Sequence, residues 1–270
     1  MVSPPYDRVH YISQSESREA ILSWFSNEQV MREEKEAFID ALVNFQDRCD
    51  SFFSYQTYFL AAEAIALFLD CSQADAIVGQ LLKWSYAFCR TSKSDWKTYP
   101  QALTIAAREA LKRTDIKRVA NRLAEIVHTT DSLVVLRRAA VELGKLNPGD
   151  ESAIAALEQL VQYTQLLHDR FKAVSSLIEV DLQNALIIPA LIEIVYADLR
   201  SDSRWVVRDV LWKFREIAIG NEAAIAVVVE LLEGLKSGLE LPSDEYLGRD
   251  DVFLCNQCAE TLGFIGVVAK

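Results

Sequence analysis

The chain has few turn-forming residues: its 270 residues include only nine glycines and six prolines. So few turn-forming residues disfavour a many-stranded sheet protein, because every hairpin in such a fold requires its own turn. Hydrophobic residues make up 51% of the sequence and charged residues 25%, a balance typical of a folded chain with a sizeable core. The composition therefore favours helices over sheets.

Signs of disulfides and of membrane spans are also missing. The five cysteines are an odd number spread along the chain, unlike the dense even set of a disulfide-stapled secreted domain. No window reaches the ~18 apolar residues of a membrane helix, and residues 1–13 hold no apolar run of signal-peptide length. We therefore expect a cytoplasmic protein with reduced thiols and no membrane partner.

The chain also lacks a cationic excess and any recognisable catalytic motif. It has 28 Lys and Arg against 39 Asp and Glu, a formal charge of -11. This negative balance disfavours a nucleic-acid partner. The three histidines are far apart, and no glycine-rich phosphate loop, HExxH or GxSxG motif occurs. We therefore expect no catalytic residues, no metal site and no cofactor.

What the sequence does contain is an internal repeat. Five segments and a degenerate sixth share the pattern small, small or aliphatic, two variable positions, apolar. The spacings between their first residues are 45, 33, 34, 37 and 48, which bracket the length of a two-helix repeat. The segments begin at Ala61, Ala106, Ala139, Ala173, Val210 and Cys258.

A second apolar run follows three of these segments. Each run opens on an Asp or Asn, a residue type that caps a helix N-terminus with its side-chain oxygen: Asp150, Asn184 and Asn221. Asn147-Pro148-Gly149 precedes the first of these runs and predicts a turn between two helices. Pro189 falls in the second turn of the second run if Asn184 is the cap, and it should bend that helix.

These features together resemble HEAT repeats, particularly the short type abundant in cyanobacterial proteins. The resemblance is carried by the Ala-Ala-x-x-Leu core at Ala139, the Asn-Pro-Gly break and the Ile-x-Ala-Leu motif at Ile188, and it is clearest over residues 131–234. It implies an all-α, right-handed α-α superhelix, that is, a HEAT/armadillo-like solenoid. Residues 1–50 would form an N-terminal helical cap, and residues 51–270 one continuous solenoid domain.

Candidate binding residues concentrate in the middle of the chain. Residues 108–138 carry eight basic side chains against four acids, whereas residues 216–251 carry nine acids against two basic residues. Such a gradient could orient an elongated partner, although solvated helix faces also explain it. Second helices usually line the concave side of HEAT arrays, so we expect a protein partner to bind the basic residues Arg113, Lys117, Arg118 and Arg122.

Aromatic residues add two more candidates. Most of them, including Trp84, occur at helical spacing and are expected to pack in the core. Trp96 lies in a polar insertion, Lys93-Ser94-Asp95-Trp96-Lys97, and Tyr246 lies in a second insertion over residues 236–249. Both are expected to be exposed anchors for the partner. Cys255-x-x-Cys258 stands alone and falls in a repeat core, so these thiols are expected to be structural.

The functional expectation is a non-catalytic HEAT-repeat scaffold or sensor module that binds a protein through its concave face and insertion loops. Similar arrays occur as free-standing proteins and as C-terminal sensor arrays of NACHT-type signalling ATPases. The alternative that the resemblance leaves open is a phycobilin lyase-like subunit, which would act on a bilin chromophore and a phycobiliprotein. A second alternative, a HEAT-type DNA-base hydrolase, would need a basic groove with a Trp and a carboxylate.

Overall fold

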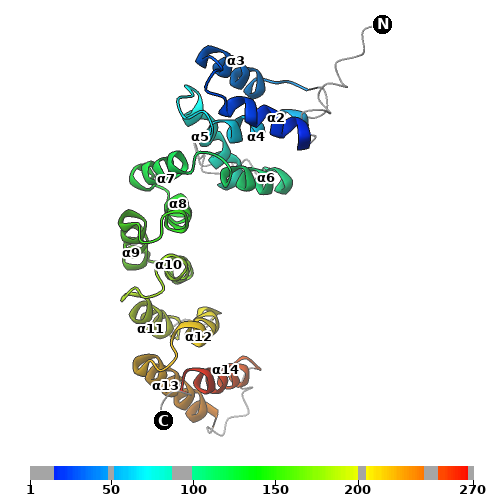
Figure 1. Cartoon of the computed structure of the whole chain (residues 1–270). Helices are drawn as coiled ribbons and strands as arrows, with labels where there is room; N and C mark the ends of the chain where they lie inside the picture. The colour runs from blue at the N-terminus through cyan, green and yellow to red at the C-terminus, as the bar shows by residue number, and fades with distance from the viewer. Residues whose placement is uncertain (1–14, 48–51, 87–98, 200–204, 240–248, 267–270) are drawn as a thin grey trace. The chain divides into compact units, whose positions relative to one another are not determined.

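The computed structural model of the chain describes residues 15–47, 52–86, 99–199, 205–239 and 249–266. These ranges form thirteen α-helices and no strand, so the predicted all-α class is confirmed (Figure 1). Helices that follow one another in the sequence pack together, as in an α-solenoid, and the right-handed sense stays a prediction. The chain divides into two compact units, Met1–Thr130 and Asp131–Lys270, while the expected boundary at residue 50 stays a prediction.

The first unit contains six helices in two layers (Figure 1). One layer consists of α2, α4 and α6, and α4 packs against both of its neighbours. The other layer consists of α3, α5 and α7, of which α5 and α7 pack together. The aromatic rings of Trp24 and Phe25 lie 5.4 and 5.6 Å from that of Phe38 and join α2 to α3. The helices are α2 (Ser15–Ser26), α3 (Arg32–Val43), α4 (Phe52–Ala64), α5 (Ala74–Tyr86), α6 (Gln101–Leu111) and α7 (Ile116–Thr129).

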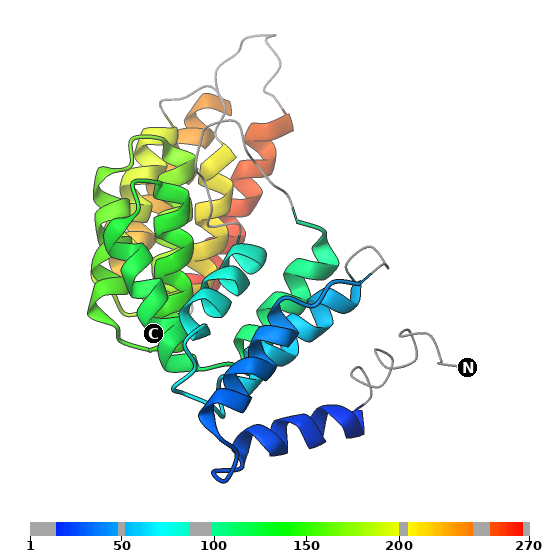
Figure 2. The ribbon, with the colours of Figure 1, turned by 90° about the horizontal axis from the view of Figure 1, so that it is seen from above.

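The second unit contains seven helices arranged in the same way (Figures 1 and 2). The first helices of successive repeats, α8, α10, α12 and α14, form one layer, and the second helices, α9, α11 and α13, form the other. The helices are α8 (Leu133–Leu146), α9 (Glu151–Tyr163), α10 (Leu167–Val180), α11 (Ile187–Asp198), α12 (Trp205–Ile217), α13 (Glu222–Leu239) and α14 (Arg249–Ile265).

The repeated small residues lie where the helices pack. All six repeat segments fall in first helices, from α4 to α14, and only Ile65 of the first segment extends beyond its helix. Ala61, Ala107, Ala139 and Cys258 are each fully buried. Small side chains at these positions allow the backbones of neighbouring helices to approach, and the larger apolar side chains fill the space that remains.

Two of the three predicted helix caps are confirmed. Asp150 accepts the amide of Ala153 at 3.0 Å, and Asn221 accepts the amide of Ala224 at 3.0 Å. The turn before Asp150 is also confirmed, because Gly149 adopts φ 85°, a left-handed conformation that glycine enters without steric cost.

The prediction for the third cap was wrong. Asn184 accepts the amide of Leu186 at 3.1 Å in a turn, and α11 begins only at Ile187. Pro189 therefore occupies the third helical position, within the first turn. Amides of the first turn have no intrahelical acceptor, so a proline there removes no hydrogen bond and the predicted reason for a bend disappears.

Side chains also connect equivalent helices of successive repeats. Lys145 Nζ of α8 lies 2.7 Å from Glu179 Oε2 of α10, and the Tyr196 hydroxyl of α11 donates to Glu230 of α13 at 2.6 Å. Both pairs join residues 34 positions apart, the spacing that separates the repeat cores of α8 and α10. Residues one repeat apart in sequence are thus neighbours in space.

Candidate functional site

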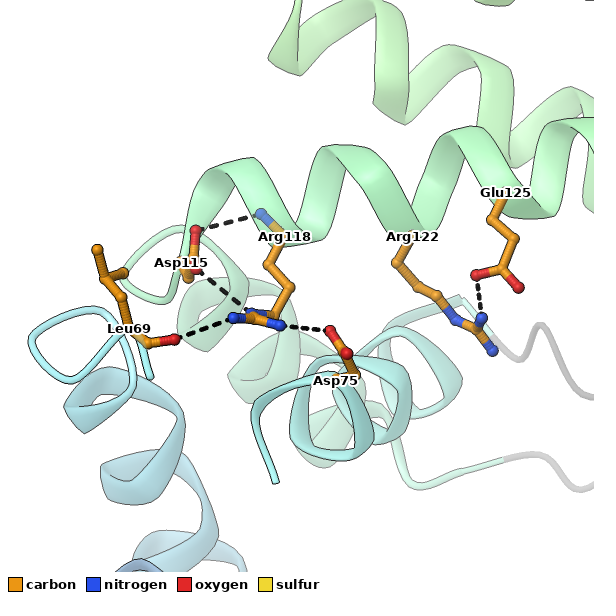
Figure 3. A network of polar contacts seen from close by, with 6 residues as sticks. All are labelled: Leu69, Asp75, Asp115, Arg118, Arg122 and Glu125. Atoms are coloured by element: carbon orange, nitrogen blue, oxygen red, sulfur yellow. Dashed lines mark hydrogen bonds and ion pairs between the residues drawn. The ribbon is translucent and has the colours of Figure 1, made fainter. Parts of the chain in front are cut away.

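Arg118, a predicted binding residue, is held by the protein itself. Its guanidinium donates to Asp75 Oδ1 of α5 at 2.7 Å, to the backbone oxygen of Leu69 at 3.1 Å and to Asp115 Oδ2 at 3.4 Å (Figure 3). Asp115 also caps α7 by accepting the Arg118 amide at 3.1 Å. The hydrogen bond to Asp75 raises the pKa of Arg118 above its ordinary value. Arg118 therefore connects α5, α7 and the turn before α5.

Lys117 and Arg122 occupy more open positions on α7. Lys117 is exposed. Arg122 pairs with Glu125 one turn further along the same helix, and 45% of its side chain is exposed (Figure 3). Ion pairs between exposed side chains on one helix are weak, about 0.3–0.5 kcal/mol, so a partner could replace Glu125 at little cost. The binding role of both residues stays a prediction.

Arg113, the fourth predicted basic residue, reaches a buried carboxylate. Its Nη1 lies 3.2 Å from Glu63 Oε1 on α4, and Glu63 also accepts the guanidinium of Arg18 from α2. Glu63 is only 7% exposed. Arg113 thus belongs to a cluster of charged side chains that links α2, α4 and the end of α6.

Two more of the eight basic residues in this stretch bond to other helices, which makes four with Arg113 and Arg118. Arg108 Nε donates to the backbone oxygen of Ser85 at 3.1 Å, and Arg137 Nη1 donates to Ser176 Oγ at 3.0 Å. Burial, and then the charge of Arg138, lower the pKa of Arg137. The excess of basic residues along the sequence therefore does not become an equal excess of open cationic surface, because the accepting groups come from other helices.

The predicted aromatic candidates divide in two. Trp96 and Tyr246 lie outside the described residues. Trp84 packs as expected, with the rings of Tyr55 and Tyr58 at 5.3 and 4.8 Å in edge-to-face geometry. Burial raises the pKa of Tyr58 to about 12, in keeping with a role in the core.

A different aromatic surface lies on α12 and α14. Arg208, Trp212 and Arg215 follow each other at intervals of four and three residues and share one face of α12. Phe253 and Phe264 are eleven residues apart, or three helical turns, and share one face of α14. The Arg208 guanidinium lies 5.5 Å from the ring of Phe253. We call these five residues the α12–α14 surface.

Arg215 holds this surface together. Its guanidinium carbon lies 4.8 Å from the Trp212 ring and 5.6 Å from the Phe264 ring. The same guanidinium donates to Thr261 Oγ1 at 2.9 Å and to both the backbone and side-chain oxygens of Gln257 at 3.0 and 2.9 Å, and it pairs with Glu260 at 3.1 Å. Only 8% of the Arg215 side chain is exposed.

The rings that flank this buried arginine are open. Trp212 is 57% exposed and Phe264 59%, and Phe253, which lies beside Arg208, is 47% exposed. An arginine fixed by hydrogen bonds restricts the aromatic rings that it lies against, so we expect Trp212 and Phe264 to be exposed without rotating widely. The surface is therefore preorganised to receive another apolar group.

The sequence analysis missed this surface, although part of its signal is visible in the sequence. Trp212 lies in the degenerate repeat segment, where the helical pattern treats a large apolar residue as a core filler. The spacing Trp212-x-x-Arg215 places an arginine next to the ring on one helix face. The contact between Arg215 and Phe264 could not be predicted from the sequence, because it depends on the register between α12 and α14.

The remaining candidates are structural. Cys258 is fully buried, as expected of a structural thiol, and burial raises its pKa to about 12, whereas Cys255 is only half-buried. Over the described ranges, no three or more His, Cys, Asp or Glu side chains group in a way that could hold a metal ion. Nor does any described helix have the length and apolar character needed to cross a bilayer.

Comparisons of the chain with family models, with curated proteins and with solved structures find no match. The HEAT resemblance accordingly stays a prediction that is carried by the repeat segments and the Asn-Pro-Gly turn. Function must be argued from the surfaces that this chain presents.

Proposed function

We propose that this chain is a non-catalytic, HEAT-type protein-binding module that engages a protein partner through the α12–α14 surface. The observation that carries the proposal is the Trp212–Arg215–Phe264 stack, in which two open rings flank a buried arginine. Trp and Arg are the residue types most enriched among side chains that dominate binding energy at protein interfaces.

The fixed geometry of the stack supports this role. Ordering a mobile side chain at an interface costs about 0.5–1.5 kcal/mol, and rings already held by Arg215 avoid part of that cost. Exposed hydrophobic residues scattered singly carry no such meaning, but here Trp212 and Phe264, from two adjacent helices, lie against the same arginine. A partner helix or strand with apolar side chains would cover them.

The basic residues of α7 would have a secondary part. Lys117 and Arg122 are available to an acidic partner, whereas Arg118 already contributes its donors to the fold. Exposed charges outside the contact area mainly change the association rate and its salt dependence rather than the final affinity. We therefore assign recognition to the α12–α14 surface and steering to α7.

Photo-crosslinking tests the proposal directly. A photoreactive phenylalanine analogue replaces Phe264, and a matched variant carries it at Tyr163, another aromatic residue of the same unit that is 70% exposed. In extracts of the native cells, we expect a discrete protein adduct from position 264 and none from position 163. The substitution Trp212→Ala in the first variant should strongly reduce that adduct. Equal adducts from both positions, or none at 264, would contradict the proposal.

A further inference from the structure

The first unit contains a pocket that the proposed protein-binding surface does not use. It lies between α2, α4 and α6 and has a volume of about 220 Å³. Its polar lining consists of Arg18, Gln56, Glu63, Glu109 and Arg113, and its apolar lining includes Phe59 and Leu60. A concave site that combines an apolar wall with converging charged groups is the usual form of a small-molecule site.

The charges at this pocket do not balance. One buried carboxylate, that of Glu63, accepts Arg18 Nε at 2.9 Å, Arg18 Nη2, and Arg113 Nη1 at 3.2 Å. Two guanidinium groups thus share a single carboxylate. The other acid in the pocket wall, Glu109, pairs with Lys112 at 2.6 Å and also interacts electrostatically with Arg113. With Lys112 included, three cationic side chains face two carboxylates. The cluster retains an excess of one positive charge.

The arginines also retain hydrogen-bonding capacity. Each guanidinium carries five N–H donors, and Glu63 receives three bonds from the pair. The side chains of Arg18 and Arg113 are 38% and 53% exposed, whereas that of Glu63 is 8% exposed. Both guanidinium side chains are therefore accessible to a ligand from solvent, whereas the carboxylate is nearly enclosed.

The size of the pocket and the geometry of its donors limit the class of ligand that it can bind. Pockets for drug-sized ligands occupy about 300–1,000 Å³, and this one is smaller, so it suits a molecule of few heavy atoms. The planar fork of a guanidinium matches a carboxylate in two parallel hydrogen bonds. The apolar wall at Phe59 and Leu60 favours a short hydrocarbon or aromatic group attached to that carboxylate.

We propose that the pocket binds a small organic monocarboxylate, with the carboxylate on Arg18 and Arg113 and the apolar part against Phe59 and Leu60. Glu63 competes with the ligand for the same donors. Because of this competition, we expect removal of the Glu63 charge to strengthen binding of the carboxylate, provided that the fold is kept.

Calorimetric titration of the full chain with benzoate and butyrate tests this site, with benzamide as the neutral match and inorganic phosphate as a second anion. We expect benzoate to bind one site. Glu63→Gln should tighten binding and Arg113→Gln should weaken it, each by roughly tenfold, the size of one charge-assisted hydrogen bond. Arg32→Gln removes another exposed arginine of the same unit, which also lies near a glutamate, and should leave the affinity unchanged.

Several results would overturn the proposal. They are no binding of either carboxylate to the wild type, an equal loss in Arg32→Gln and Arg113→Gln, or benzamide binding as tightly as benzoate. Phosphate binding that matches benzoate in strength would refute the carboxylate assignment. If Glu63→Gln does not fold, as judged by circular dichroism, the comparison of Arg113→Gln with Arg32→Gln decides, because both changes are made at exposed positions.

Discussion

At the scale of single residues, Gly144 shows how closely the repeats approach. A Cβ at this position would lie 2.4 Å from Val180 Cγ1 at the end of α10. Valine has one side-chain torsion and a stiff branched end, so it cannot move aside easily. The glycine is required for contact between α8 and α10, although nothing in its local sequence distinguishes it from other helical glycines.

We therefore expect Gly144→Ala to destabilise the protein. Overpacking costs about 1–3 kcal/mol, and the better helix propensity of alanine returns about 1 kcal/mol, so a net loss of about 1 kcal/mol should appear in urea unfolding followed by circular dichroism. Gly234→Ala is the control, because a Cβ there meets no atom within 4 Å. It should be neutral or stabilising, and an equal loss in both variants would contradict the packing argument.

Asp198 is a second residue whose role only the structure reveals. It ends α11, is 2% exposed, and accepts the amides of Val206 and Val207 at 2.9 and 3.0 Å in the first turn of α12. The capping group lies eight and nine residues before the two amides that it caps. Sequence rules look for a cap directly before a helix, so they could not find it.

Substitution of Asp198 should be costly. Asp198→Ala leaves two buried amides without this acceptor, and we expect a loss of about 2–3 kcal/mol in the free energy of unfolding. Asp198→Asn keeps one acceptor oxygen and should lose clearly less. The same urea titration measures both, and equal losses in the two variants would show that side-chain shape rather than capping matters.

At the scale of helices, the caps explain where prediction succeeded and failed. Asp150 and Asn221 each lie directly before their helices, and the expected cap bonds form. Asn184 has the same local sequence character, yet the chain makes one more turn before α11 begins. An Asn side chain can accept a backbone amide either in a turn or as a helix cap, and the local sequence allows both. The packing of the apolar residues that follow decides which of the two forms.

The Asp150 cap predicts a dependence of stability on pH. Burial opposes ionisation of this carboxyl, but hydrogen bonds from Ser152, the Ala153 amide and Asn147 prevail and lower its pKa below the ordinary 3.8. A group with a lowered pKa in the fold stabilises the protein above its unfolded pKa and loses this contribution as pH falls through the folded value.

Unfolding of Asp150→Asn by urea at pH 7 and at acid pH measures this contribution. At pH 7 the variant should be less stable than the wild type by about 0.3–1 kcal/mol, because Asn keeps the cap but loses the negative charge that favours a helix N-terminus. The difference should begin to shrink as pH falls below the ordinary value of 3.8 and disappear below the lower pKa of the folded state, where the wild-type carboxyl is protonated. A constant difference across this range would show that the charge of Asp150 is not involved.

At the scale of the whole molecule, the repeat was the predictable part. Its spacing follows from small residues that recur in the sequence, and the structure places all six segments in first helices. The partners of the basic residues were not predictable. Glu63 and Asp75 lie about 40–50 positions from the arginines that they accept, and only the stacking of helices brings them together. For the same reason, the sequence predicted binding at α7 and did not predict the exposed rings on α12 and α14.

The affinity of the crosslinked partner for two variants tests the central claim most directly. Hot-spot residues contribute about 2 kcal/mol or more each, so Trp212→Ala with Phe264→Ala should weaken binding by at least ~100-fold. Lys117→Gln with Arg122→Gln should change the affinity only a few-fold, mainly through the association rate. Loss of binding in the α7 variant, with binding retained by the Trp212 and Phe264 variant, would contradict the account.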